Sequence, residues 1–204
     1  MPFYRDHILP RLIHLAMQRE EFAPYRERAV ATATGRILEV GIGSGANLPF
    51  YGAGAHEIVG LEPSSRLAAM ARQAAIHTPL PLTVIEASAE AIPLDDRSID
   101  TVVMTWTLCS IPAAIPALRE MLRVLKPGGR LLFVEHGLGP DPRIRKWQHR
   151  LTPCWKHLAG GCHLDRAINT LVQDAGFRIE KLDTGYMRGP RPLTFLYEGV
   201  AVAG

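Results

Sequence analysis

Apolar runs alternate with amphipathic segments along most of this chain of 204 residues. Runs that are apolar at nearly every position predict strands buried on both faces of a sheet. Such runs lie at Arg36–Val40, Ile58–Leu61, Leu82–Ile85, Ile99–Thr105 and Arg130–Glu135. Apolar residues spaced three or four apart predict helices over the first thirty or so residues and at Arg66–Ile76, Ala113–Leu125, Arg143–His157 and Asp165–Ala175.

The alternation of strands and helices predicts a parallel sheet that is covered by helices on both faces. Two further strands, Arg178–Thr184 and Leu193–Val202, follow each other without a helix, so we expect an antiparallel partner there. No repeat or long linker interrupts the chain, and its length suits one domain. Ligands of such sheets bind at the carboxyl ends of the strands, where the strand order reverses.

Three glycines follow the first predicted strand at alternate positions, Gly41, Gly43 and Gly45. Without Cβ atoms they allow a sharp turn and let a ligand lie against the main chain. Glu62 ends the second predicted strand, roughly 20 residues further on, where a carboxylate can accept hydrogen bonds from both hydroxyls of a ribose. The sequence therefore predicts a ligand that contains adenosine.

NAD is a rival ligand, because residues 41–46 also satisfy the relaxed dinucleotide pattern. Three features favour a different adenosine compound. Glu39 precedes the turn by two residues, where an acid suits a cationic amino-acid tail and repels a pyrophosphate. The second feature is the turn at residues 126–129 together with the closing pair of strands. The third is the segment 87–93, which follows the third predicted strand at the distance of an adenine.

Four motifs, in this combination and order, resemble those of the class I S-adenosylmethionine-dependent methyltransferases. They are LEVGIGSG (38–45), LEP (61–63), AEAIP (89–93) and LKPGG (125–129). The resemblance implies a Rossmann-like α/β fold, with a seven-stranded sheet of order 3-2-1-4-5-7-6, strand 7 antiparallel, and helices on both faces. It divides a single domain, 1–204, into an N-terminal helical cover (1–35), a cofactor-binding core (36–136), and substrate-side helices with the closing strands (137–204).

The resemblance also implies S-adenosyl-L-methionine as the cofactor. Glu39 and the main chain of the glycine turn would hold the methionine end, Glu62 the ribose, and Pro63 would line the adenine slot. The cofactor-binding candidates are Glu39, Gly41, Gly43, Gly45, Asn47, Glu62, Pro63, Ser64, Ser88, Ala89, Glu90 and Thr105. Many members carry an aspartate at the position of Ser88, whose hydroxyl only partly replaces the contact with the adenine amino group.

Further segments resemble a narrower group, the methyltransferase-like alkyl thiol S-methyltransferases and their bacterial relatives. They are residues 45–51, 107–110, 135–136, 153–157 and 161–166. Methyl transfer from a sulfonium is an in-line displacement, so the enzyme mainly positions and desolvates the reactants. A thiol costs about 2 kcal/mol to ionise at pH 7 and a phenol about 4 kcal/mol, so a site that offers only histidines suits a thiol.

The first candidate for a base or orienting group is His136, at the end of the fifth predicted strand. His157 is the second, and Asp165, which would steer a histidine, is the third. Bacterial phosphatidylethanolamine N-methyltransferases share the glycine motif, so N-methylation of that lipid or of a small amine is the alternative, with the basic cluster Arg143–Arg150 as its phosphate contact. More distant alternatives are an NAD(P)-binding oxidoreductase and a non-catalytic cofactor-binding protein.

Composition is ordinary for a globular protein, with 47% hydrophobic residues, 21% charged residues and a net charge of +3. No basic stripe interleaved with aromatic residues points to nucleic acid, and no apolar stretch reaches the roughly 20 residues of a membrane span. Three cysteines without a CxxC pair favour a reducing compartment and, with the nearby histidines, do not match a zinc site. We expect a cytoplasmic enzyme with a small-molecule substrate, peripheral membrane contact at most, and no metal; the oligomeric state is left open.

Overall fold

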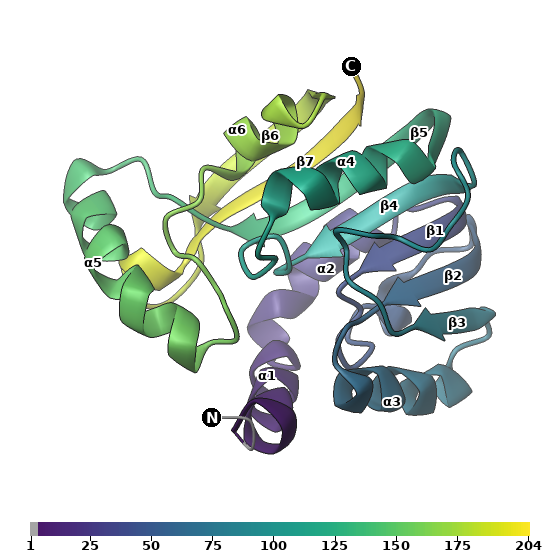
Figure 1. The fold of residues 1–204 in the computed structure, drawn as a ribbon, viewed down its shortest axis with the longest axis horizontal. Coiled ribbons are helices and arrows are strands. Elements are labelled where there is room, and N and C mark those ends of the chain that lie inside the picture. Colours follow the sequence, from purple (N-terminus) through teal and green to yellow (C-terminus); the bar gives the residue numbers. More distant parts are fainter. Residues whose placement is uncertain (1–3) are drawn as a thin grey trace.

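The computed structural model describes residues 4–204, so residues 1–3 of the expected N-terminal cover lie outside it. Its strands are β1 (Gly35–Val40), β2 (Ala55–Leu61), β3 (Leu82–Ile85), β4 (Ile99–Thr105), β5 (Leu125–His136), β6 (Phe177–Tyr186) and β7 (Phe195–Ala203). They form one sheet in the order β3-β2-β1-β4-β5-β7-β6 (Figure 1). Only β7 runs antiparallel to its neighbours within this described sheet. The predicted fold class and strand order are therefore confirmed.

Helices cover both faces of this sheet. They are α1 (Leu9–Met17), α2 (Ala23–Val30), α3 (Ser65–Ala74), α4 (Ala114–Val124), α5 (Pro142–Leu158) and α6 (Ile168–Asp174), with shorter π- or 3₁₀-helical turns at Tyr4–Ile8, Glu20–Phe22, Leu48–Phe50, Ala75–His77 and Arg191–Leu193. In Figure 1, α4 and α6 lie side by side in front of the sheet and α2 lies behind it. The helix α5 stands away from the sheet, at the side where the strands end.

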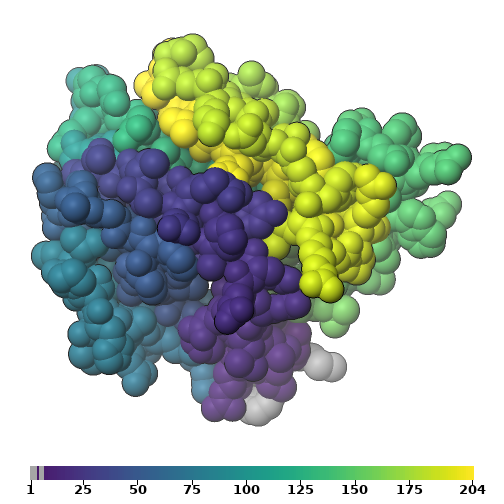
Figure 2. All heavy atoms as spheres, turned by 180° about the vertical axis from the view of Figure 1, so that it is seen from behind, coloured from purple at the N-terminus to yellow at the C-terminus, as the bar shows by residue number. Residues whose placement is uncertain are grey.

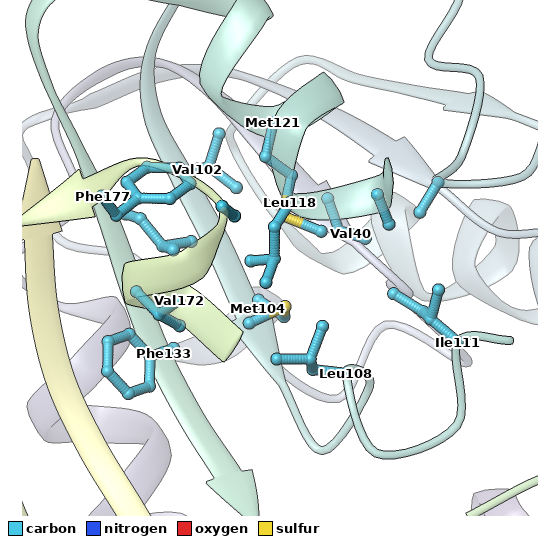
Figure 3. Packing of buried hydrophobic residues seen from close by; sticks show 14 of the residues in the cluster. Val40, Val102, Met104, Leu108, Ile111, Leu118, Met121, Phe133, Val172 and Phe177 are labelled. Atoms are coloured by element: carbon cyan, nitrogen blue, oxygen red, sulfur yellow. The ribbon is translucent and has the colours of Figure 1, made fainter. Parts of the chain in front are cut away.

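The main hydrophobic core lies between the sheet and the helices α4 and α6 (Figure 3). Leu118 and Met121 of α4 and Val172 of α6 meet Met104 and Phe133 of the strands, and all five side chains are fully buried. Burial of each such side chain stabilises the fold by about 1.5–3 kcal/mol. This packing holds the strands in register and fixes the position of their carboxyl ends.

The N-terminal segment differs from the single helix that was predicted. The first helix, α1, ends at Met17, and a second helix, α2, begins at Ala23. Pro24 lies in the first turn of α2, where the missing N–H of proline breaks no hydrogen bond. The buried guanidinium of Arg26 donates to the carbonyl of Met17 at 3.0 Å, so a side chain of α2 satisfies the end of α1. Figure 2 shows this purple segment beside the yellow C-terminal strands, which Arg28 joins through an ion pair with Glu198 at 2.8 Å.

Several predicted boundaries also move. The helix predicted from Asp165 begins at Ile168. The fifth strand begins at Leu125, because Leu125 already pairs with Ile99 of β4. The next pair is Arg130 with Thr101, so the predicted turn at residues 126–129 forms a bulge inside the strand.

Candidate active site

A cavity of about 260 Å³ lies at the carboxyl ends of β1, β2 and β4, where the strand order reverses. Its walls come from the segments that follow these strands, from residues 87–90 after β3, and from α1, α2 and the end of α5. Among the described residues that line it, the ionisable ones are Arg26, Glu39, Glu62 and Glu90. The cavity is therefore acidic overall and suits a ligand that carries positive charge.

The turn after β1 brings main chain rather than side chains to the cavity. Gly41, Gly43 and Gly45 have φ angles of 69°, 58° and 82°, which other residues rarely adopt. A Cβ on Gly41 would lie 2.4 Å from the side chain of Thr107, and one on Gly45 would lie 2.9 Å from Leu48. A Cβ on Gly43 would meet only a carbonyl oxygen at 3.9 Å, so the space above Gly43 is open to a ligand.

Glu62, which is 6% exposed, ends β2 with both carboxylate oxygens held by the main chain. The N–H of Gly43 donates to Oε2 at 3.0 Å, and the N–H of Ser64 donates to Oε1 at 2.9 Å. Burial raises the pKa of Glu62, and these two hydrogen bonds oppose the rise. Each oxygen keeps a lone pair, so the fixed carboxylate can accept two neighbouring hydroxyls. Pro63 lines the cavity, whereas the Ser64 hydroxyl caps α3.

Glu39, which is 2% exposed, lies beneath the glycine turn in a buried polar network. Its carboxylate accepts hydrogen bonds from the Tyr51 hydroxyl at 2.7 Å and from the Asn47 amide at 2.9 Å. The Asn47 amide also donates to Thr105 at 3.0 Å and accepts from Arg26 at 2.5 Å. Burial raises the pKa of Glu39 to about 7, although Tyr51, Asn47 and Arg26 oppose this rise. Glu39, Asn47 and Thr105 were predicted as cofactor-binding residues, whereas Tyr51 and Arg26 were not.

Residues 87–90 form the wall on the side of β3. The Ser88 hydroxyl donates to the carboxylate of Glu90, whose other oxygen accepts the N–H of Ala113 at 3.1 Å. Ser88 therefore gives its proton to Glu90, and its oxygen keeps lone pairs that can accept a hydrogen bond. Ala89 is buried and adds an apolar side chain to this wall.

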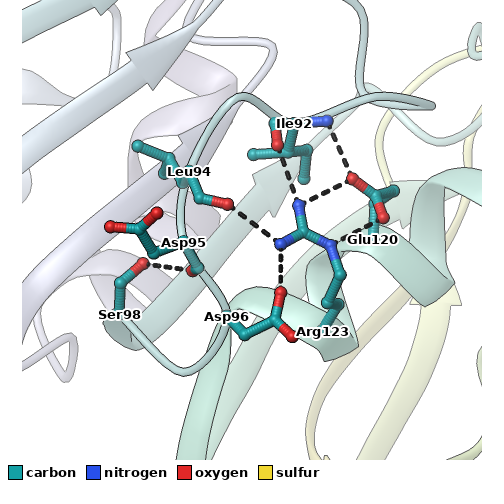
Figure 4. A network of polar contacts seen from close by, with 7 residues as sticks. All are labelled: Ile92, Leu94, Asp95, Asp96, Ser98, Glu120 and Arg123. Carbon is teal, nitrogen blue, oxygen red and sulfur yellow. Dashed lines mark hydrogen bonds and ion pairs between the residues drawn. The ribbon is translucent and has the colours of Figure 1, made fainter.

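Arg123 of α4 anchors the chain that follows this wall (Figure 4). Its guanidinium donates to the carbonyls of Ile92 and Leu94 at 2.8 and 2.9 Å and pairs with Asp96 at 2.6 Å. Glu120 pairs with Arg123 at 2.8 Å and accepts the N–H of Ile92 at 3.0 Å. The hydrogen bonds to Glu120 and Asp96 raise the pKa of Arg123. The network therefore holds the β3–β4 connection on α4 and, with it, the end of the wall.

The opposite end of the cavity is mostly apolar. Ile13 and Met17 of α1 line it together with Trp106, which follows β4. Trp106 has a φ of 50°, and its ring lies edge-on to Phe22, with 4.9 Å between the ring centroids. The guanidinium of Arg26 lies 4.9 Å from the centre of the same ring. We call this end of the cavity, with Thr107, Ser110 and Gly160, the acceptor end.

Glu135 holds the turn that forms the acceptor end. Its fully buried carboxylate accepts the N–H groups of Thr107 at 2.7 Å and Cys109 at 3.4 Å. Burial raises the pKa of Glu135 well above its ordinary value. Glu135 was predicted only as part of the motif at residues 135–136, and its contacts with the turn are seen only in the structure.

The three catalytic candidates lie outside the cavity lining. His136 is 5% exposed, and neither ring nitrogen has a partner that meets hydrogen-bond geometry among the described residues, although a contact with the main chain of Pro192 favours its protonated form. Burial lowers its pKa to about 4, and the alternation of side chains along β5 points it away from the turn described above. His157 is exposed near the end of α5, and Asp165 contacts His149 at 2.9 Å and His163 at 3.7 Å. The structure therefore does not bring His136, His157 and Asp165 together.

The helix α1 and the turn at Tyr4–Ile8 that precedes it are attached to both sides of the cavity. The Tyr4 hydroxyl donates to the carbonyl of Leu158 at 2.8 Å, and His14 Nδ1 lies 2.8 Å from the Ser44 hydroxyl. Ile13 and Met17 are held over the cavity by these contacts. Among the side chains that the structure describes, no three of His, Cys, Asp or Glu are grouped in a way that could hold a metal ion.

Comparisons with known proteins agree with this geometry. Residues 38–133 match the family described as "Methyltransferase domain". The thiol S-methyltransferase TMT1B of Rattus norvegicus is 31% identical over 191 residues, which cover 92% of this chain and 76% of the relative. Phosphatidylethanolamine N-methyltransferase of Cereibacter sphaeroides is 30% identical over 169 residues, 79% of this chain and 78% of that one. A solved methyltransferase structure from Thermotoga maritima shares the fold, with a TM-score of 0.68 and 23% identity over 97% of this chain and 98% of that one.

This chain therefore belongs to the class I S-adenosylmethionine-dependent methyltransferases, which confirms the predicted family and enzyme class. Within that class it is similar, over nearly its whole length, to thiol S-methyltransferases of rat and human. In the part of the chain that the structure describes, no helix combines the length and the apolar character needed to span a bilayer.

Proposed function

We propose that this enzyme transfers the methyl group of S-adenosylmethionine to the sulfur of a small, apolar thiol. The observation that carries the proposal is the character of the acceptor end. It offers the apolar side chains of Ile13, Met17 and Trp106 and the neutral hydroxyls of Thr107 and Ser110. This surface can bind an uncharged organic thiol, but it offers no carboxylate or imidazole to deprotonate a poorly acidic acceptor.

The cofactor, when bound, supplies an electrophilic methyl group on its sulfonium. We assign its ribose hydroxyls to Glu62 and its amino group to Glu39, with the methionine end against the main chain of Gly43. Residues 87–90 and Pro63 would enclose the adenine. The fixed carboxylate of Glu62, the open space above Gly43 and the buried, poorly solvated Glu39 fit these groups.

A thiol places the smallest demand on such a site. About 3% of a thiol of ordinary pKa is ionised at pH 7, so supplying the thiolate costs about 2 kcal/mol. Arg26 is the one cation among the described residues that line the cavity, and a nearby guanidinium favours the thiolate. The chain then acts mainly by aligning sulfur with the methyl group and by excluding water.

The role of His136 as a base remains a prediction. A His136→Asn variant retains a polar side chain but cannot take up a proton near neutral pH. If His136 is the base, this variant lowers kcat and changes its pH profile, while cofactor affinity stays unchanged.

Phosphatidylethanolamine is a second candidate acceptor, and the outer face of α5 favours it. Trp147, Leu151 and Leu158 are 54%, 38% and 63% exposed, and their spacing places them along one side of the helix. Arg143 and Arg150 are also exposed on α5. An apolar stripe with cations nearby suits the interface of an anionic membrane.

Labelled S-adenosylmethionine separates the two acceptors. The enzyme is incubated with a small alkyl thiol, with the alcohol of the same carbon skeleton, or with vesicles that contain phosphatidylethanolamine. We expect label in the thiol and none in the alcohol. We expect a Glu62→Ala variant to transfer little label to any of the three. Label that enters the lipid and not the thiol would overturn the proposal in favour of the second acceptor.

A further inference from the structure

Two cysteines from distant parts of the chain meet beside the acceptor end of the cavity. Cys109 is buried in the turn after β4, and Cys162 is half-buried between α5 and α6. The main chains beside them are joined, because the N–H of His163 donates to the carbonyl of Cys109 at 2.8 Å, and each thiol lies close enough to shift the pKa of the other. The third cysteine, Cys154, is exposed on α5. The fold therefore places one thiol pair side by side and keeps the third thiol at the surface.

The surroundings of the pair favour Cys162 as the nucleophile. Cys162 is the more accessible of the two, and the interaction between the thiols lowers its pKa and raises the pKa of Cys109, whereas burial and the carboxylate of Glu135 oppose the fall at Cys162. Arg166, which donates to main-chain carbonyls after β4, favours the ionised form of both thiols to a smaller extent. The buried indole nitrogen of Trp155 has no partner that meets hydrogen-bond geometry among the described residues, and its N–H favours an anion on Cys162.

We propose that Cys109 and Cys162 form a thiol–disulfide exchange site for small organic disulfides, the oxidised counterparts of thiol acceptors. The Cys162 thiolate attacks one sulfur of the disulfide, whose S–S bond breaks and releases a thiolate that takes a proton from solvent. Cys109 then attacks the Cys162 sulfur and passes its proton to the second leaving thiolate. Two electrons move from the protein dithiol to the small disulfide, and two small thiols are released.

The new bond ties together two segments that line the acceptor end, one through Ser110 and the other through Gly160. These segments are already close, since a Cβ on Gly161 would lie 3.1 Å from the carbonyl oxygen of Ser110. A disulfide draws its sulfurs to about 2.05 Å, nearer than two unbonded sulfur atoms can lie, so both segments must shift. If the proposed function holds, the oxidised enzyme methylates thiols more slowly, by about tenfold or more, because methyl transfer depends on alignment.

The test treats the full chain with bis(2-hydroxyethyl) disulfide and maps its disulfides by mass spectrometry before any methyl acceptor is added. We expect a Cys109–Cys162 bond in the wild type and in the matched control Cys154→Ser. The Cys109→Ser variant should retain the small thiol on Cys162, and the Cys162→Ser variant should leave Cys109 unmodified. An adduct confined to Cys154, or a stable adduct on Cys162 of the wild type, would overturn the proposal.

Methyl transfer is then measured on the same samples before oxidation, after oxidation and after reduction with a phosphine. We expect the rate to fall on oxidation and to recover on reduction. A complete disulfide with an unchanged rate would refute its link to the acceptor end. A reduced enzyme that methylates no thiol would instead refute the proposed function, and it would leave the disulfide mapping unaffected.

Discussion

The affinity for S-adenosylmethionine is expected to fall below neutral pH because Glu39 takes up a proton. Burial raises the pKa of Glu39 to about 7. Its ionised form would attract the cationic amino group of the cofactor, and its neutral form would not. About half of the Glu39 carboxyls are ionised at pH 7, about a tenth at pH 6 and about a hundredth at pH 5. Affinity should therefore fall about fivefold from pH 7 to pH 6, about 1 kcal/mol, and about tenfold more to pH 5.

Isothermal titration calorimetry with S-adenosylhomocysteine measures this effect without turnover. The control ligand is 5′-methylthioadenosine, which has the nucleoside but lacks the amino-acid tail. Since Glu62 also has a raised pKa, the control ligand reports any pH dependence that comes from the ribose contact. The difference in slope between the two ligands isolates Glu39. Binding at pH 7 should also release about half a proton, which appears as a dependence on the buffer's ionisation enthalpy.

Two variants sharpen the same measurement. Glu39→Gln should bind S-adenosylhomocysteine weakly and with the same slope as the control ligand. Tyr51→Phe removes a hydrogen bond that lowers the pKa of Glu39, so its loss of affinity should begin at a higher pH. Equal affinities at pH 5 and pH 7 for the full ligand, or equal slopes for both ligands, would refute the assignment of Glu39.

Four further substitutions have expected outcomes. Glu62→Ala should weaken cofactor binding by about 1–3 kcal/mol in calorimetry, and unchanged affinity would remove Glu62 from the ribose site. Gly41→Ala should lower the free energy of unfolding by about 2 kcal/mol or more in urea, because a Cβ there adds a clash to the strain of a positive φ. Gly43→Ala should lower it by about 1 kcal/mol, from the strain alone, but should lose most of the cofactor affinity. Equal effects of the two variants on stability would contradict this reasoning. Arg123→Met should lower the free energy of unfolding by about 1–2 kcal/mol, because it loses the hydrogen bonds to two carbonyls, while its partly exposed ion pairs contribute little. If the variant unfolded at the same urea concentration as the wild type, the network would add nothing to stability.

Much of the fold could be predicted because its causes are local. Strands such as Ile99–Thr105 are buried on both faces, so they appear in the sequence as continuous apolar runs. The glycine turn and Glu62 could be predicted for a similar reason, since each follows directly from the end of a strand. Boundaries were less reliable where a distant side chain sets them, as Arg26 does at the end of α1.

The rest of the candidate site depends on contacts between residues far apart in the chain. Tyr51 and Arg26 reach Glu39 and Asn47 only after the sheet and α2 have packed together. His136 was predicted at the site because it ends a strand beside the expected methyl position. Which way that residue faces depends on the pleat of β5, and no motif in the sequence encodes it.

The central claim is that the corner between β1 and β2 binds the cofactor through two acidic side chains. A crystal structure of the complex with S-adenosylhomocysteine tests it most directly. We expect both ribose hydroxyls within hydrogen-bond distance of the Glu62 carboxylate and the amino group beside Glu39. A nucleoside bound elsewhere, with Glu62 contacting only the main chain as it does without ligand, would contradict the account.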